Sequence, residues 1–203
     1  ALSTAIALPP PQTRYIYSGP IVSGATLGTW SHVAMPAERQ VACSAWRVDR
    51  RSLALAYRAD LPQREHVESE RAKLLADEQQ ALRAGNEQAA RDLRALVERA
   101  TRLLSRLRSL PPGDSYPLEL RVWRMGDAVW LAVQGEPYNL LQKALRERFR
   151  ATPIVVAALA NSWGPSYLPP REIYGKGIYQ ESIAVLEAGC LEKLIEVATE
   201  RVA

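Results

Sequence analysis

Two loops in the C-terminal half of the chain carry the residues best suited to chemistry. Gly135-Glu136-Pro137 follows a strongly apolar run at 128–133, and the loop from Asn161 to Tyr167 follows a second apolar run at 154–160. A helical pattern separates the two runs, and the order strand, helix, strand is almost always a parallel crossover. Both loops then leave the same edge of the sheet, where open α/β sheets bind their ligands. A carboxylate and a phenol at this edge can hold a metal ion or an oxyanion between them.

Each of these residues also has a structural alternative. Glu136 follows a buried strand and precedes a helix, whose dipole favours the ionised carboxylate, so its alternative role is that of a helix N-cap. Tyr167, Tyr174 and Tyr179 lie in one short segment. Taken singly, each is alternatively a half-buried aromatic residue with a hydrogen-bonded hydroxyl. Sequence spacing alone leaves these alternatives open.

The other chemistry-bearing residues do not complete a site. His32 is expected in an early loop and His66 on the solvent-facing side of a helix, and the sequence has no HxH or HExxH pair. A catalytic zinc ion needs three or four protein ligands, so this chain requires histidines from elsewhere to form one. Cys43 and Cys190 permit one disulfide and exclude a cysteine-rich zinc site. The chain also lacks a GxSxG elbow and a glycine-rich phosphate loop.

The elements that position the two loops predict an α/β fold, with an α+β arrangement as the alternative. Alternating apolar residues at 118–122 predict a half-buried strand, and Gly126-Asp127 predicts a tight hairpin into the run 128–133. That run is apolar throughout, so we expect it to be buried on both faces. Pro137 is expected in the first turn of the crossover helix, and the run 154–160 in a second buried strand. The sequence therefore predicts a mixed sheet with a β-hairpin and a β-α-β crossover.

Residues 61–110 predict an inserted antiparallel helical hairpin. The segment is dense in Arg, Glu, Gln, Ala and Leu, and its apolar residues recur at helical spacing. Asp60 is a candidate cap for the first helix, and Ala84-Gly85-Asn86 interrupts the pattern where a tight turn is needed. The arginines of the hairpin either form a partner-binding arm or cover a solvated face. The flanking regions are an N-terminal segment, 1–60, with a proline-rich lead at 9–11, and the α/β portion 111–203, which carries the candidate site.

Composition excludes several classes of function. The chain has 203 residues, 47% of them hydrophobic, and a formal net charge of +4. Its arginines are interleaved with Glu and Asp instead of being massed together, which argues against nucleic-acid binding. No stretch approaches the roughly 20 apolar residues of a transmembrane helix. The chain begins at Ala1 without the features of a secretion signal, so we expect a trimmed or processed chain whose upstream part is absent.

Two longer motifs resemble a known family of enzymes. They are the run from Trp123 to Pro137, which ends in Gly-Glu-Pro, and the run from Leu159 to Tyr179, which includes Tyr-Leu-Pro-Pro. Together they resemble the later part of the catalytic domain of neutral/alkaline non-lysosomal ceramidases, and most of all the divergent bacterial ceramidase-like hydrolases. The resemblance covers about residues 116–195 well and 15–30 more faintly. The helical hairpin has no counterpart in the well-known ceramidases.

The resemblance implies a zinc-dependent hydrolysis of an amide. In that family two histidines from the earlier part of the domain, the glutamate of the Gly-Glu loop and a later tyrosine hold zinc, and Glu136 and Tyr167 match the last two ligands. The family has a further tyrosine twelve residues after the ligand tyrosine, which supports the oxyanion, and Tyr179 matches it. Zinc activates water for attack on the carbonyl carbon, and the general acid is a histidine that this chain lacks.

The sequence therefore predicts the C-terminal part of a ceramidase-like zinc amidohydrolase, inactive by itself. It expects Zn²⁺ only with histidine ligands from an upstream segment or chain of the same protein, and a lipid amide or other small amide as substrate. Nucleic acid and a transmembrane segment are not expected, and the resemblance is compatible with an exported or periplasmic protein. The alternatives are a noncatalytic scaffold that binds a protein partner through the helical hairpin, and a two-chain enzyme whose larger chain supplies the histidines.

Overall fold

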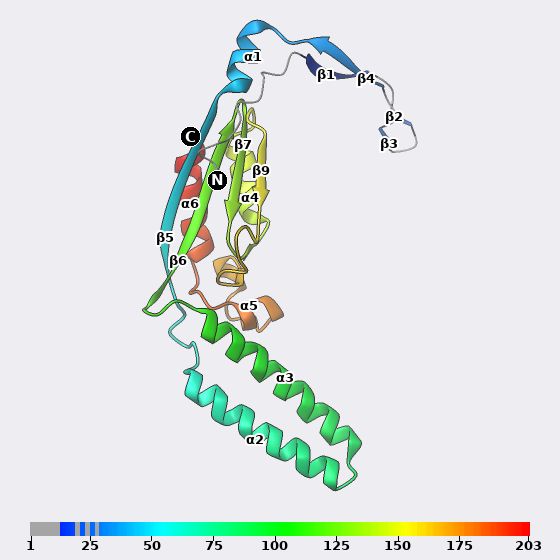
Figure 1. Ribbon diagram of the computed structural model, residues 1–203, viewed down its shortest axis with the longest axis vertical. Coiled ribbons are helices and arrows are strands. Elements are labelled where there is room, and N and C mark those ends of the chain that lie inside the picture. Colours follow the sequence, from blue (N-terminus) through cyan, green and yellow to red (C-terminus); the bar gives the residue numbers. More distant parts are fainter. Residues whose placement is uncertain (1–12, 19–20, 23–24, 27–28) are drawn as a thin grey trace.

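A four-stranded mixed sheet is the centre of the fold (Figure 1). The computed structural model describes residues 13–18, 21–22, 25–26 and 29–203. The sheet has the order β5-β6-β7-β9, in which β5/β6 and β6/β7 are antiparallel and β7/β9 are parallel. Its strands are β5 (Trp46–Ala56), β6 (Ser115–Met125), β7 (Ala128–Val133) and β9 (Ile154–Ala157). The predicted α/β class with a mixed sheet is confirmed.

The β-hairpin and the crossover both lie where the sequence predicts them. Met125 pairs with Ala128 across a two-residue turn, whose Gly126 has a φ of +65° that glycine adopts readily. The crossover runs from β7 through α4 (Leu140–Arg148) to β9. Leu141 and Leu145, one helical turn apart, are the buried residues of α4 and face the core. The chain segments that follow β7 and β9 consequently leave one edge of the sheet.

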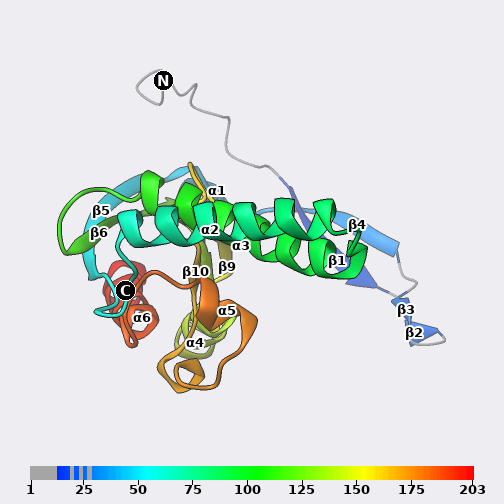
Figure 2. The same cartoon turned by 90° about the horizontal axis from the view of Figure 1, so that it is seen from below.

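Helices α4 and α6 (Cys190–Val202) cover one face of the sheet (Figure 2). Their apolar residues pack with the inward-facing residues of the strands into one hydrophobic core. Fully buried leucines dominate this core: Leu55, Leu118, Leu120, Leu131, Leu141, Leu145, Leu168, Leu186, Leu191 and Leu194. Burial of a leucine side chain stabilises the fold by about 1.5–3 kcal/mol, so this cluster holds the two site-bearing loops on a rigid base.

The opposite face of the sheet exposes a row of apolar residues. Val48, Trp123, Trp130 and Val155 are register partners across the four strands and share this face. Val48 is 51% exposed and Trp130 is 43% exposed. The prediction that 128–133 is buried on both faces is therefore wrong, because α4 and α6 cover the other face, on which Val129 and Leu131 lie.

Helices α2 (Arg64–Arg83) and α3 (Glu87–Ser109) form the predicted hairpin, which projects from the sheet (Figure 1). Asn86 caps α3, since its side chain accepts a hydrogen bond from Ala89 N at 3.1 Å. The hairpin has a small core of its own at the end nearest the sheet. Its buried members are Val67, Ala100, Leu104 and Leu107. His66 is exposed on α2, as expected.

Short elements make up the rest of the described chain. They are β1 (Thr13–Ser18), β2 (Ile21–Val22), β3 (Ala25–Thr26), β4 (Thr29–Ala34), α1 (Ala37–Ser44), β8 (Glu136–Pro137), β10 (Tyr167–Leu168), the 3₁₀ helix η2 (Arg171–Ile173) and α5 (Tyr179–Ile183). His32 lies in β4, so its prediction as a loop residue is wrong. The proline-rich lead at 9–11 lies outside the described residues. Of the helices that are described, none is both long and apolar enough to cross a membrane.

Two predicted boundaries differ in the structure, and the sequence does not predict strand β5. Strand β5 had no sequence prediction, because only Leu53 and Leu55 of its residues are buried and the strand shows no long apolar alternation. Strand β9 ends at Ala157, and Leu159 then adopts a positive φ of 56° that no strand tolerates. Pro137 belongs to β8 and not to the crossover helix, which begins at Leu140, because residues 136–137 pair with β10 instead.

Candidate functional site

The two loops singled out in the sequence meet in a short parallel bridge. Strands β8 and β10 pair in parallel, with Glu136 opposite Tyr167 and Leu168 opposite Pro137. Two backbone hydrogen bonds hold the bridge: Glu136 N donates to Ser166 O at 2.8 Å, and Tyr138 N donates to Leu168 O at 3.2 Å. The carboxylate and the phenol therefore come from neighbouring backbone positions at one edge of the sheet.

Glycines allow the two loops to approach this closely. Gly135 has a φ of +74°, and a Cβ atom there would lie 2.7 Å from Ser166 O. Gly164 on the opposite loop has a φ of +57°, and its Cβ would lie 2.9 Å from Gly135 N. Real Cβ atoms do not approach backbone atoms at such distances. The Gly-Glu sequence thus has a physical reason, since the residue before Glu136 must have no side chain for the bridge to form.

The loop that leads into Tyr167 has an unusual backbone. Leu159, Asn161 and Ser166 have φ angles of 56°, 68° and 67°, a region that residues other than glycine seldom occupy. Ser166 is only 1% exposed, and its hydroxyl has no hydrogen-bond partner among the residues that the structure describes. Such strained conformations cost about 1–3 kcal/mol each and concentrate at functional sites. Here they turn the chain back from β9 to place Tyr167 beside Glu136.

Glu136 does not cap the crossover helix. Helix α4 begins at Leu140 with Asn139 as the N-cap residue, so Glu136 lies outside its first turn. Glu136 is half-buried, and within residues 33–203 its carboxylate takes part in no hydrogen bond or ion pair. Glu136 is therefore not a helix cap, and its half-buried carboxylate at the bridge has no partner among residues 33–203.

Tyr179 lies next to Tyr167. The two ring centroids are 6.2 Å apart and the rings meet edge to face at 69°. Partial burial raises the pKa of Tyr167. The nearby Glu136 carboxylate, and then the hydroxyls of Tyr179 and Tyr138, raise it further. The structure therefore gathers all three predicted residues in one place, with two phenols and one carboxylate in a small volume. Tyr174, the third tyrosine of this segment, contacts Leu186 O and Arg58 instead.

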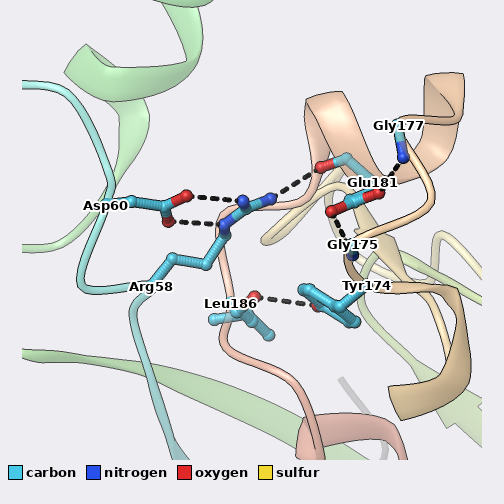
Figure 3. Close-up of polar contacts among 7 residues, drawn as sticks. All are labelled: Arg58, Asp60, Tyr174, Gly175, Gly177, Glu181 and Leu186. Atoms are coloured by element: carbon cyan, nitrogen blue, oxygen red, sulfur yellow. Dashed lines mark hydrogen bonds and ion pairs between the residues drawn. The ribbon is translucent and has the colours of Figure 1, made fainter.

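The Glu181 carboxylate accepts hydrogen bonds from the backbone of the loop that carries Tyr179 (Figure 3). Glu181 accepts hydrogen bonds from Gly175 N at 2.6 Å and from Gly177 N at 2.7 Å. These bonds, that from Gly175 first, lower the pKa of Glu181 because they favour its ionised form. The loop from 175 to 181 is thus closed on itself, and Tyr179 lies at its middle, as the first residue of α5.

Arg58 and Tyr174 tie this closed loop to the rest of the fold (Figure 3). Arg58 donates to both carboxylate oxygens of Asp60, at 2.8 and 2.7 Å, and to Glu181 O at 2.8 Å. Tyr174 donates from its hydroxyl to Leu186 O at 2.8 Å, and burial strongly raises its pKa. Asp60 therefore orients Arg58 and is not the helix cap that the sequence predicted, since α2 begins only at Arg64. No sequence pattern marked these contacts, because Arg58 and Glu181 are far apart in the chain.

A metal ion can find two oxygen ligands here, but not a full set. In residues 33–203, no three His, Cys, Asp or Glu side chains are grouped to hold a metal ion. Glu136 and Tyr167 supply two oxygen donors on one side of the bridge. Zinc accepts oxygen ligands but needs at least three ligands from protein, so the residues present fit half of a zinc site. Cys43 and Cys190 are free thiols and lie outside this group.

Tyr167 and Tyr179 also line a cleft of about 570 Å³ between α3 and α5. A larger hollow of about 1520 Å³ borders α6 and the start of β6, but none of the three predicted site residues lines it. The smaller cleft therefore adjoins the candidate site. We find no protein-family description, no curated protein and no solved structure that matches this chain.

Proposed function

We propose that this chain is the C-terminal part of a zinc-dependent amide hydrolase of the ceramidase-like kind. The observation that carries the proposal is the parallel pairing of Glu136 with Tyr167, with the ring of Tyr179 centred 6.2 Å from that of Tyr167. Two residues that are far apart in sequence meet as the resemblance requires. The remaining ligands are two histidines from an upstream segment or chain, and the chain alone has no activity.

Each residue has a distinct role in the proposed reaction. Glu136 and Tyr167 would hold their side of the metal through one carboxylate and one phenol oxygen. Bound zinc supplies a water activated at neutral pH and polarises the carbonyl of the amide. Tyr179 donates its hydroxyl hydrogen to the carbonyl oxygen as negative charge develops there. The closed loop at 175–181 keeps that hydroxyl in place during the reaction.

The exposed apolar face of the sheet supports the proposal that another segment of the protein packs against this chain. Trp46 is 50% exposed, and Val48 and Trp130 are exposed on the same face. A contiguous apolar surface of this kind usually marks an interaction site. In the proposal, the segment that brings the histidines also covers this face.

The test is turnover of a polypeptide that includes the upstream segment. Tyr179→Phe removes one oxyanion donor and lowers the turnover number by about 10²-fold, while the bound zinc stays at the wild-type level. Tyr57→Phe is the matched control, because its hydroxyl donates to Pro111 O away from the site, and its turnover stays near that of the wild type. Unchanged turnover in Tyr179→Phe would remove this residue from the mechanism.

The projecting hairpin favours a second candidate function, a noncatalytic scaffold. Helices α2 and α3 extend well beyond the sheet (Figure 1), and Leu82 and Leu96 on them are 45% and 46% exposed. In that case the hairpin binds a protein partner. The scaffold gains support if neither zinc nor amide hydrolysis is detected when the upstream segment is present.

A further inference from the structure

The cleft beside the tyrosines has one basic wall and one aromatic wall. Helix α3 forms the first wall, and the segments around Tyr167 and α5 form the second. The residues of the two walls are Arg99, Arg102, Leu103 and Arg106 on one side and Trp163, Tyr167, Tyr179, Ser182 and Ile183 on the other. At about 570 Å³ the cleft has the size of a site for a small organic molecule.

The three arginines form a stripe along α3. Positions 99, 102 and 106 are three and four residues apart, which places them on one side of the helix. Among the described residues, Arg102 pairs only with Glu98, at 3.5 Å and with both side chains exposed. Arg106 donates to Ile183 O at 3.4 Å. Arg99 makes no ion pair within residues 33–203. Three guanidinium groups therefore line the cleft, and none of its described lining residues is a carboxylate.

Other arginines of α3 are neutralised within the hairpin. Arg94 pairs with Glu78 at 2.8 Å, and Arg108 pairs with Glu68 at 2.8 Å. Both carboxylates belong to α2, so these two arginines have counter-ions on the neighbouring helix. Among the described residues, Arg99 and Arg106 of the stripe have none, and Arg102 has the exposed Glu98. If the arginines of α3 only covered a solvated face, this difference in ion pairing between the two sides of the helix would not be expected.

Arg106 carries its charge in a half-buried position beside two other arginines, whose charges repel it. Burial lowers the pKa of Arg106. The nearby Tyr179 opposes this lowering, and the charges of Arg102 and Arg99 add to it. An anion placed among the three guanidinium groups removes this repulsion and forms charge-assisted hydrogen bonds. Arginine is well suited to carboxylate and phosphate because its planar fork matches two oxygens at once.

The opposite wall offers contacts to an apolar group. Trp163 is 53% exposed and Tyr179 is 66% exposed, and Ile183 lines the same wall. Leu103 adds one apolar side chain from α3. Large aromatic side chains exposed at a cleft are typical of binding surfaces. A ligand that joins an anion to an apolar chain would meet both walls.

We infer that this cleft binds an anionic amide, with the carboxylate or phosphate of its amine portion on Arg99, Arg102 and Arg106 and its acyl chain on Trp163 and Tyr179. The inference rests on the proposed function for the choice of an amide and names its substrate class. It separates this chain from an enzyme for an uncharged lipid amide. The helical hairpin then has a role, because it supplies the basic wall.

Binding to the 203-residue chain tests the inference without metal or turnover. Three probes are titrated calorimetrically: N-octanoylglycine, phosphorylated N-octanoylethanolamine, and uncharged N-octanoylethanolamine as the neutral analogue. We expect at least one anionic probe to bind about tenfold more tightly than the neutral one, with the difference shrinking at 0.5 M salt. The tighter anionic probe distinguishes carboxylate from phosphate.

The chain provides a closely matched control for the arginine stripe. Arg102→Gln and Arg91→Gln each remove one positive charge from α3. Each also removes one exposed ion pair to a glutamate four residues earlier, at 3.5 Å for Arg102 and 3.4 Å for Arg91. Only Arg102 lines the cleft. We expect Arg102→Gln to weaken binding of the anionic probe about fivefold or more and to leave the neutral probe unchanged, while Arg91→Gln changes neither.

Three comparisons of binding would overturn the inference. They are equal affinity for charged and neutral probes, equal effects of the two arginine substitutions, and tighter binding of an acidic hexapeptide than of either acyl probe. Absence of binding by all three probes at millimolar concentration also refutes it. Because the assay uses neither zinc nor turnover, the failure of the proposed hydrolase is a separate result, seen only in metal content and catalytic rate.

Discussion

Replacing Gly135 by alanine tests whether close approach of the two loops builds the site. The new Cβ would lie 2.7 Å from Ser166 O and 3.0 Å from a methyl group of Leu168. The first of these atoms is backbone and cannot rotate away. The substitution must therefore push β8 away from β10 or change the backbone angles on one side of the bridge.

The cost has two parts. An alanine at a φ of +74° costs about 1–2 kcal/mol of stability, because the left-handed region is unfavourable for L-residues. Weakening the hydrogen bond from Glu136 N to Ser166 O, now 2.8 Å, costs about 1 kcal/mol more, and residual contact strain adds to it. Together they predict a destabilisation of about 2–4 kcal/mol.

Gly177→Ala is the matched control for this prediction. Gly177 has a φ of +66°, but nothing lies within 4 Å of its Cβ position. Its substitution carries only the backbone cost of about 1–2 kcal/mol. Urea unfolding followed by tryptophan fluorescence reports on the α/β portion, because all five tryptophans lie outside residues 61–110. Equal destabilisation by the two substitutions would refute the claim that contact between the loops requires a glycine at 135.

Two further substitutions test the hairpin and the loop of Tyr179. Asn86→Ala removes the cap of α3 and costs about 1 kcal/mol, measured by urea unfolding with far-ultraviolet circular dichroism; no loss of stability would show that the cap is dispensable. Glu181→Gln tests the pH dependence of stability. The folded state lowers the pKa of Glu181, so its carboxylate stabilises the fold at pH values above its unfolded pKa of about 4.3. This stabilisation is lost as the pH falls through the lower pKa of the folded state. The wild type should therefore be more stable than Glu181→Gln at pH 6 and lose this advantage towards pH 3, whereas a constant difference would contradict the assignment.

The sequence predicts the parts of the fold whose signals are local. The run 128–133 and the hairpin at 61–110 have the strand and helix patterns that such elements need, and both lie where predicted. Strand β5 has no such pattern, because it is an edge strand with only two buried residues. Its place in the sheet depends on pairing with β6, which no local pattern reveals.

The candidate site was predictable in part for the same reason. The crossover topology brings Glu136 and Tyr167 to one edge, and topology can be inferred from the order of elements. The position of Pro137 could not be inferred, because proline suits both a first helical turn and a strand end, and only the partner strand β10 decides between them. The arginine stripe at 99, 102 and 106 is visible in the sequence, but its neighbours Trp163 and Tyr179 are not.

Metal content of the polypeptide that includes the upstream segment tests the central claim most directly. With purified protein and equilibrium dialysis against zinc, the wild type should hold about one zinc ion per chain, and Glu136→Gln should lose most of it. Glu172→Gln, an exposed residue of η2, is the control and should bind zinc like the wild type. Full zinc content in Glu136→Gln, or stoichiometric zinc on residues 1–203 alone, would contradict the account of a half-site completed by another segment.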